Sequence, residues 1–404
     1  MKTSDSEEAQ EGGAWLRLAL MVAAVIALGA RFGPWVAVIV LAFVVIIFLH
    51  ELGHYLTAKW AGMKVTEFFL GFGPRIWSFQ RGETEYGIKA IPAGAYVKII
   101  GMHNLEEVDP ADEERTYRAQ PTWRRLSVAV AGSTMHFLLA FVIICVVVMG
   151  FGLPRLVPVL DSVRGPAQAA GLLPGDEIVS FDGEAVTGWD QVSDEIRSRP
   201  GEQVDVVVER AGQRRTIEVH LASERPGGEK AGYLGVGPST RNVRYGPWKG
   251  VQEMGSVAKQ SVVGLGHLFS PSGVSDYVDN VTSARHGDGS VRLGTPSENR
   301  PQSIVGIVDV GSQIAEDGVI NLLYLLFAVN IFIGLFNLTP LLPFDGGHVV
   351  IALYEKVRSM IAGRRYQADV AKLLPLTYAV VAALALLFVT TLYMDIINPV
   401  DINK

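Results

Sequence analysis

Cysteine and long basic runs are nearly absent from this sequence of 404 residues. Its one cysteine, Cys145, excludes an intrachain disulfide and a structural zinc site built from several thiolates. Lys and Arg total 35 against 41 Asp and Glu, and no stretch carries the basic cluster typical of nucleic-acid-binding proteins. We therefore expect neither a disulfide framework nor a nucleic acid partner.

Apolar residues, by contrast, make up 49% of the chain, which is too many for an ordinary soluble enzyme. A membrane-spanning helix needs roughly 20 such residues in a row. Five stretches approach or reach that length: 14–30, 34–58, 126–150, 319–338 and 376–394. The sequence therefore predicts a polytopic α-helical protein of the lipid bilayer, with four core spans and one extra span near the N-terminus.

The stretch 14–30 is the weakest of the five, because it is short and contains Arg17. A signal peptide has an apolar region of similar length, but it is preceded by basic residues, and here the preceding residues are acidic. We therefore predict that residues 1–33 form a tail and an uncleaved transmembrane helix.

Lys and Arg side chains near the ends of the spans predict which loops face the cytoplasm. They gather in the loop after the second span and in the loop before the last one: Lys59, Lys64, Arg118, Arg124 and Arg125, then Lys356, Arg358, Arg364, Arg365 and Lys372. Both loops are therefore predicted to be cytoplasmic. The long segment 151–318 then lies on the opposite side of the membrane.

Two segments outside the spans have the composition of β structure. Aromatic and β-branched residues around a turn at 80–83 predict a hairpin over 66–101, lying against the membrane. Residues 156–222 contain short β-branched runs separated by turns, which predicts a small, mostly β domain. The segment 223–318 is predicted to hold an amphipathic helix at 245–275 and a linker at 284–303.

The second span ends in an H-E-x-x-H pattern formed by His50, Glu51 and His54. Histidines four residues apart lie on one face of a helix, so both imidazoles can bind one ion, and Zn²⁺ is the ion expected. Glu51 lies beside them as the candidate general base. The alternative is a pair of structural histidines. It is disfavoured because placing Glu and two His in an apolar span costs several kcal/mol.

A catalytic zinc requires a third protein ligand, and Asp345 in the fourth apolar region is the candidate. Pro340 and Pro343 precede it, and two glycines follow it. These residues interrupt a helix, so the carboxylate can turn toward the interior of a helix bundle. An Asp-Gly-Gly sequence alone would indicate only a turn; combined with the histidine pair it predicts a metal site.

Together these motifs resemble the site-2 protease family of bacterial intramembrane zinc metalloproteases, including members similar to the regulator of sigma-E protease. Asn337, Pro340, Asp345 and Gly346 match its N-x-x-P-x-x-x-x-D-G motif. The resemblance implies that Asp345 is the third zinc ligand and that Asn337, with Pro340, binds substrate. It also implies hydrolysis of peptide bonds in single-pass membrane proteins such as anti-sigma factors, in regulated intramembrane proteolysis. The cytoplasmic membrane is then the location, with the active site near its cytoplasmic side.

Residues 156–222 resemble a bacterial PDZ domain. The matching positions are Gly171, Leu172, Gly175, Asp176, Ile178 and Gly183. The resemblance implies a peptide-binding groove beside Gly171 and Leu172, outside the cell. Such a domain either obstructs the active site or recruits substrate. The two halves of the protease core are then 34–150 and 319–404, on either side of this domain and the segment 223–318.

Two other interpretations remain beside this one. A zinc protease that takes a glutamate as third ligand would need neither the Asn–Asp motif nor a PDZ domain. A non-catalytic PDZ membrane adaptor with a structural metal would have no need of Glu51. Two further histidines have structural explanations: His136 as a buried histidine bonded to a backbone carbonyl, and His348 as a residue supporting Asp345 or the helix end.

Overall fold

The computed structural model describes residues 19, 23, 26–102, 104–283 and 301–397. The predicted first span at 14–30 lies largely outside this part, and so does most of the predicted linker at 284–303. The chain divides into two compact units. The larger combines Met1–Cys145 with Gly250–Lys404, and we call it the core unit; Val146–Lys249 is the inserted unit.

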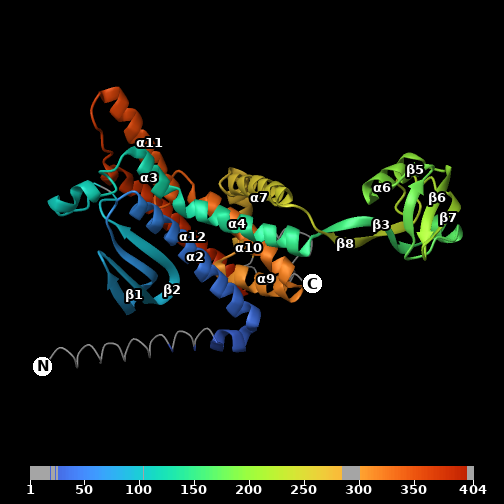
Figure 1. Ribbon diagram of the computed structural model, residues 1–404, viewed down its shortest axis with the longest axis horizontal. Coiled ribbons are helices and arrows are strands. Elements are labelled where there is room, and N and C mark those ends of the chain that lie inside the picture. Colours follow the sequence, from blue (N-terminus) through green and yellow to red (C-terminus); the bar gives the residue numbers. More distant parts are fainter. Residues whose placement is uncertain (1–18, 20–22, 24–25, 103, 284–300, 398–404) are drawn as a thin grey trace. The chain divides into compact units, whose positions relative to one another are not determined.

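Four helices in the described part are long and apolar enough to cross a membrane, which confirms the predicted polytopic fold. They are α2 (Pro34–Trp60), Ala131–Phe151, α10 (Val319–Asn337) and Val370–Ile397. The second comprises α4 (Ala131–Cys145) and a π-helical end, and the fourth is α12 (Leu374–Ile397) after a 3-10 turn. In the core unit, α4 packs along both α2 and α10 (Figure 1).

Helix α2 carries the H-E-x-x-H pattern. Glycine and proline residues determine where this helix begins and how closely it packs against α4. Gly33 has a φ of 102° and Pro34 occupies the first turn, a combination that starts the helix without losing a needed backbone donor. Near the other end, a Cβ on Gly53 would lie 2.8 Å from the carbonyl oxygen of Ala131. Glycine at 53 therefore permits α2 and α4 to approach closely beside the metal motif.

The predicted hairpin is formed by β1 (Val65–Arg81) and β2 (Thr84–Ile99), which are antiparallel. The middle of β1 pairs on both sides: Phe68 lies opposite Tyr86 on one side and Val97 on the other. Residues 95–99 therefore form an outer strand segment. Among the described residues, no strand pairs with its second edge.

Five further α-helices complete the described part of the core unit. They are α3 (Thr122–Ala129), α7 (Pro247–Leu268), α8 (Pro271–Ser283), α9 (Ile304–Glu316) and α11 (Asp345–Ala362). The amphipathic helix predicted at 245–275 is found as α7 and the start of α8. Helix α3 packs against both α2 and α11, so it links the two regions that contain the predicted metal ligands.

The inserted unit is a six-stranded antiparallel sheet with two short helices. Its elements are β3 (Leu153–Val163), α5 (Gly165–Ala169), β4 (Glu177–Phe181), β5 (Glu184–Ala185), α6 (Trp189–Ser198), β6 (Gln203–Arg210), β7 (Gln213–His220) and β8 (Val236–Val243). The strand order is β7-β6-β4-β3-β8, with β5 beside β4. Strand β8 pairs along β3, so the sheet extends beyond residue 222. This mostly β unit is consistent with the predicted PDZ domain.

Candidate metal centre

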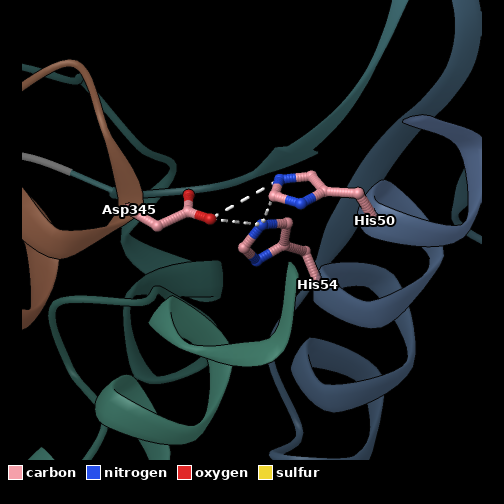
Figure 2. Close-up of side chains that lie close together, drawn as sticks. All are labelled: His50, His54 and Asp345. Carbon is pink, nitrogen blue, oxygen red and sulfur yellow. Dashed lines mark hydrogen bonds and ion pairs between the residues drawn. The ribbon is translucent and has the colours of Figure 1, made fainter. Parts of the chain in front are cut away.

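His50, His54 and Asp345 meet at one point inside the core unit. Figure 2 shows both imidazoles projecting from α2 toward the carboxylate at the start of α11. Oδ2 of Asp345 lies 3.5 Å from Nε2 of His50 and 3.3 Å from Nε2 of His54, and the two Nε2 atoms are 3.2 Å apart. The three side chains are 11%, 12% and 19% exposed, so the cluster is largely shielded from solvent.

The spacing of these three atoms fits a zinc ion. Tetrahedral zinc with bonds of about 2.0–2.2 Å to nitrogen and oxygen places its ligand atoms about 3.3–3.6 Å apart. The observed separations of 3.2, 3.3 and 3.5 Å come close to these edges. Oδ2 of Asp345 is also buried and accepts no hydrogen bond among the described residues, so an ion would satisfy it. Two imidazoles and one carboxylate leave a fourth position for water or substrate.

A backbone carbonyl fixes the orientation of His54. Its Nδ1 lies 2.8 Å from the carbonyl oxygen of Val128, which belongs to α3. A carbonyl can only accept, so Nδ1 carries the proton and Nε2 presents its lone pair toward Asp345 and His50. Helix α3 thereby supports a residue of α2.

Gly132, in the first turn of α4, leaves the room that the two imidazoles occupy. A Cβ there would lie 2.2 Å from Cε1 of His50 and 2.5 Å from Nε2 of His54. No real Cβ tolerates such contacts. Any other residue at 132 would therefore displace the histidines or the helix.

The position of Asp345 depends on the loop that interrupts the helical structure after the third core span. Helix α10 ends at Asn337 and α11 begins at Asp345, as the prolines and glycines predict. A Cβ on Gly346 would lie 2.2 Å from the carbonyl oxygen of Leu338, and one on Gly347 would lie 2.7 Å from the amide of Leu342. Both glycines allow α11 to start directly against the connecting loop, which brings the carboxylate to α2.

Glu51 faces the same site from α2. Its Oε1 lies 4.0 Å from Nε2 of His50, and its side chain is 18% exposed. Glu51, His54 and Asp345 line a cavity of about 140 Å³ together with Val97 and Ile99 of the outer strand segment 95–99. The cavity has room for several waters or a short stretch of peptide backbone.

Two polar residues beside the cluster have partners that the sequence did not predict. Nδ1 of His136 lies 3.0 Å from Oδ1 of Asn330, whereas the sequence predicted a bond to a backbone carbonyl. Asn330 gives its amide proton to the carbonyl oxygen of Leu326, so its Oδ1 is oriented as the acceptor. The ring of His136 lies 5.0 Å from that of His50. The pair joins α4 to α10.

Four predicted residues remain, two in the core unit and two in the inserted unit. Asn337 is the last residue of α10, and Pro340 is exposed in the loop that follows. In the inserted unit, Gly171 has a φ of 87°, and its carbonyl accepts a hydrogen bond from Arg210. Leu172 is 1% exposed and belongs to the hydrophobic core, so only its backbone is available to a groove.

Comparisons with known proteins identify the family of this chain. The model of peptidase family M50 matches residues 38–382. The zinc metalloprotease Rip1 of Mycobacterium tuberculosis (strain H37Rv) is 32% identical, with 89% of this chain and 96% of that protein covered. Rip1 of Mycolicibacterium smegmatis is 30% identical over 92% of this chain and 99% of that protein. A putative zinc metalloprotease of Brucella suis is 32% identical over 78% and 84%.

Among solved structures, the PDZ domain of the SdrC-like protein from Listeria innocua aligns with 22% of this chain and 97% of that domain. It does so at 20% identity and with a TM-score of 0.19, too low to carry an argument. The family assignment of the chain therefore rests on the family model and on relatives that match nearly the whole chain. The chain belongs to peptidase family M50, which confirms the predicted membership of the site-2 protease family.

Proposed function

We propose that this chain is an intramembrane zinc metalloprotease in which His50, His54 and Asp345 hold the metal. The observation that supports this best is the near-tetrahedral spacing of 3.2–3.5 Å among their three ligand atoms. The relatives' names, zinc metalloprotease, agree with that donor set. An adaptor with a structural metal would close the site with a fourth protein ligand, and the only such cluster in the described part of the chain has three.

Hydrolysis of a peptide bond requires a general base next to the metal centre, and Glu51 lies there. A zinc ion held by these residues would polarise a substrate carbonyl and would lower the pKa of a bound water, so that hydroxide is available as the nucleophile at neutral pH. Glu51 takes the proton of the attacking water and delivers it to the leaving amine. Val128 keeps His54 in the tautomer that leaves Nε2 free for the metal.

A substrate helix must unwind before it can be cut, and we propose that the outer strand segment 95–99 receives the unwound part. Its second edge has no partner strand among the described residues, and Val97 and Ile99 line the cavity that contains Glu51. An extended peptide added to this edge would lie beside the base. Asn337, at the end of α10, is proposed to bind the substrate backbone or the developing oxyanion, with Pro340 shaping the loop beside it.

The proposed substrates are single-pass membrane proteins such as anti-sigma factors, and the proposed location is the cytoplasmic membrane. The Lys and Arg distribution supports an active site near the cytoplasmic face and an inserted unit outside the cell. Single cysteines introduced at Asp112, Arg364 and Gln213, in a Cys145→Ser background, test this orientation. The first two are expected to react with a membrane-impermeant reagent only from the cytoplasm, and the third only from outside. The reverse pattern would contradict it.

The test of the chemistry is metal content and cleavage of a transmembrane peptide by the protein in detergent. Glu51→Gln should retain zinc but lose roughly 10²–10⁴-fold in turnover, because the change removes a base and no ligand. Asp345→Asn should lower both zinc affinity and turnover, because a neutral amide is a poor zinc ligand. Loss of zinc in Glu51→Gln, or full activity in Asp345→Asn, would contradict the assigned roles.

A further inference from the structure

A buried ion pair connects α3 to α11, at residues 230 positions apart in the chain. Nη1 of Arg125 lies 2.5 Å from Oε2 of Glu355, and each residue is 7% exposed. The other carboxylate oxygen, Oε1, accepts a hydrogen bond of 2.7 Å from the amide of Ala368. The guanidinium also lies 5.0 Å from the ring centroid of Tyr117. The charges are therefore held in one geometry by several neighbours.

This pair is a poor means of stabilising the fold. Burying two charges carries a desolvation penalty that their attraction repays only when every other polar atom is satisfied. Nε of Arg125 is buried and has no hydrogen-bond partner in the described part of the chain. Apolar residues of similar volume would serve stability as well or better. An ion pair of this kind is better explained by the register that it imposes on two helices.

The two helices that it joins carry the two halves of the metal centre. Val128, whose carbonyl orients His54, follows Arg125 by three residues on α3. Asp345 begins α11, ten residues before Glu355, a distance of about 15 Å along the helix. Sliding or rotation of α11 against α3 would therefore move the carboxylate relative to the imidazoles. Apolar contacts alone resist such sliding weakly, because they are not directional.

We propose that Arg125 and Glu355 are positioning residues of the metal centre. Their ion pair sets the register between α3 and α11, so that Oδ2 of Asp345 meets both Nε2 atoms at ligand spacing. Metal sites lose affinity when their ligands are misplaced by about 0.5 Å, so a register device has a purpose here. The proposal rests on the proposed zinc site, and neither residue touches the reacting atoms.

The test measures zinc affinity and the visible spectrum of the Co²⁺-substituted full-length protein in detergent. The informative variant is the double replacement Arg125→Met with Glu355→Met. It removes both charges together and is expected to unfold at or above the wild-type temperature. It should nevertheless bind zinc roughly 10- to 100-fold more weakly, the loss typical when a residue that supports a ligand is removed. Its Co²⁺ bands should shift or broaden, because the ligand geometry is no longer held.

Two single variants keep the test decisive if the double variant does not fold. Glu355→Gln retains the shape of the side chain and its bond to Ala368 but removes the charge. Arg125→Lys retains the charge but not the planar guanidinium group with its several hydrogen-bond donors. We expect Arg125→Lys to retain more zinc affinity than Glu355→Gln. The matched control is Glu113→Gln, which breaks an ion pair with Arg118 inside a single loop of the core unit and should leave zinc binding unchanged.

The outcomes separate this proposal from the proposed function. Wild-type protein that binds no zinc, or binds it as well with Asp345→Asn, would overturn the metal site and the positioning role together. Weakened binding in Asp345→Asn with wild-type affinity and Co²⁺ spectrum in folded Arg125 and Glu355 variants would overturn only the positioning role. Weakened binding in those variants at unchanged thermal stability would support it.

Discussion

The core unit and the inserted unit bury different kinds of side chain. The interior of the inserted unit is almost wholly apolar, with Phe181 and Val206 among its fully buried residues. The core unit, whose helices meet lipid, instead buries many polar groups, among them the pair of His136 with Asn330 and the pair of Arg125 with Glu355, and it largely shields the metal cluster from solvent. Buried polar groups are costly and must be partnered. The comparison indicates that function determines the interior of the first unit and stability that of the second.

The strongest test of this contrast adds one methyl group to the core unit, at Gly132. Gly132→Ala places a Cβ where it would lie 2.2 Å from Cε1 of His50, so an imidazole or α4 must move. We expect zinc affinity and peptide cleavage to fall by roughly 100-fold, at the upper end of the loss seen when a residue that supports a metal ligand is removed. Metal content and turnover in detergent measure the effect.

Gly255→Ala in α7 is the matched control, since a Cβ there meets nothing within 4 Å. This change also replaces a helical glycine by alanine, which favours the helix by roughly 0.5–1 kcal/mol. Wild-type zinc binding in Gly255→Ala, with a large loss in Gly132→Ala, is the expected pair of results. Equal zinc binding in both variants would show that the metal cluster does not need the space at 132.

The inserted unit is predicted to govern access and to have no part in the chemistry. Its sheet runs from Leu153 to Val243, so replacement of residues 153–243 by a flexible linker removes it cleanly. A domain of about 100 residues has a radius of gyration near 13 Å, wide enough to obstruct a bulky substrate ectodomain when it is tethered to a membrane span. The replaced protein should cut substrates with intact ectodomains, and cut trimmed substrates at the original rate. Immunoblots of both substrate forms in cells measure this.

Recruitment of substrate by the inserted unit predicts the opposite result. A groove that captures a new C-terminus by strand addition would supply affinity for trimmed substrates. Without it, trimmed substrates would be cut more slowly and intact ones would still be refused. Continued refusal of intact substrates after the replacement would therefore contradict obstruction.

The sequence predicted those parts of the site that depend on local spacing. His50 and His54 could be identified because four residues in a helix bring two side chains to one face, and the four core spans because a bilayer requires a fixed apolar length. Asp345 could be identified only together with the histidine pair and the family motif, since nothing in its own neighbourhood separates a ligand from a turn. The structure brings its carboxylate to the two histidines.

Other features could not be found in one sequence, because they depend on contacts between distant segments. The carbonyl of Val128 has no signature, since every residue has one. Gly132 is an ordinary residue of an apolar helix in the sequence, and its purpose appears only when α2 lies against α4. Arg125 and Glu355 are 230 residues apart, and two charged residues in loops predicted to be cytoplasmic give no indication that they are buried. Strand β8 was likewise missed, because its pairing with β3 is long-range.

The smallest expected effect concerns the one charged side chain in the described part of the inserted unit that is fully buried. Asp176 is 1% exposed, and its carboxylate accepts hydrogen bonds from Nε and Nη2 of Arg210 and from the amide of Leu173. Burial by itself would raise the pKa of Asp176, but the bonds from Arg210 and Leu173 outweigh it and lower the pKa below its ordinary value. A carboxyl with a depressed folded-state pKa stabilises the fold fully above its unfolded pKa, about 3.9, and this contribution is lost as the pH falls through the folded value.

The inserted unit should therefore keep its stability down to about pH 4 and lose it progressively in stronger acid. Arg210→Gln removes the main interaction that lowers the pKa of Asp176. That pKa should therefore rise, and the loss of stability should begin at higher pH. Hydrogen exchange of peptides from β4 and β6 in the full-length protein measures this locally, independently of metal binding in the core unit. Glu218→Gln, which alters an exposed carboxylate paired with Gln203, is the control and should follow the wild-type acid profile. If Arg210→Gln also followed that profile, the bonds from Arg210 would not be what keeps Asp176 ionised.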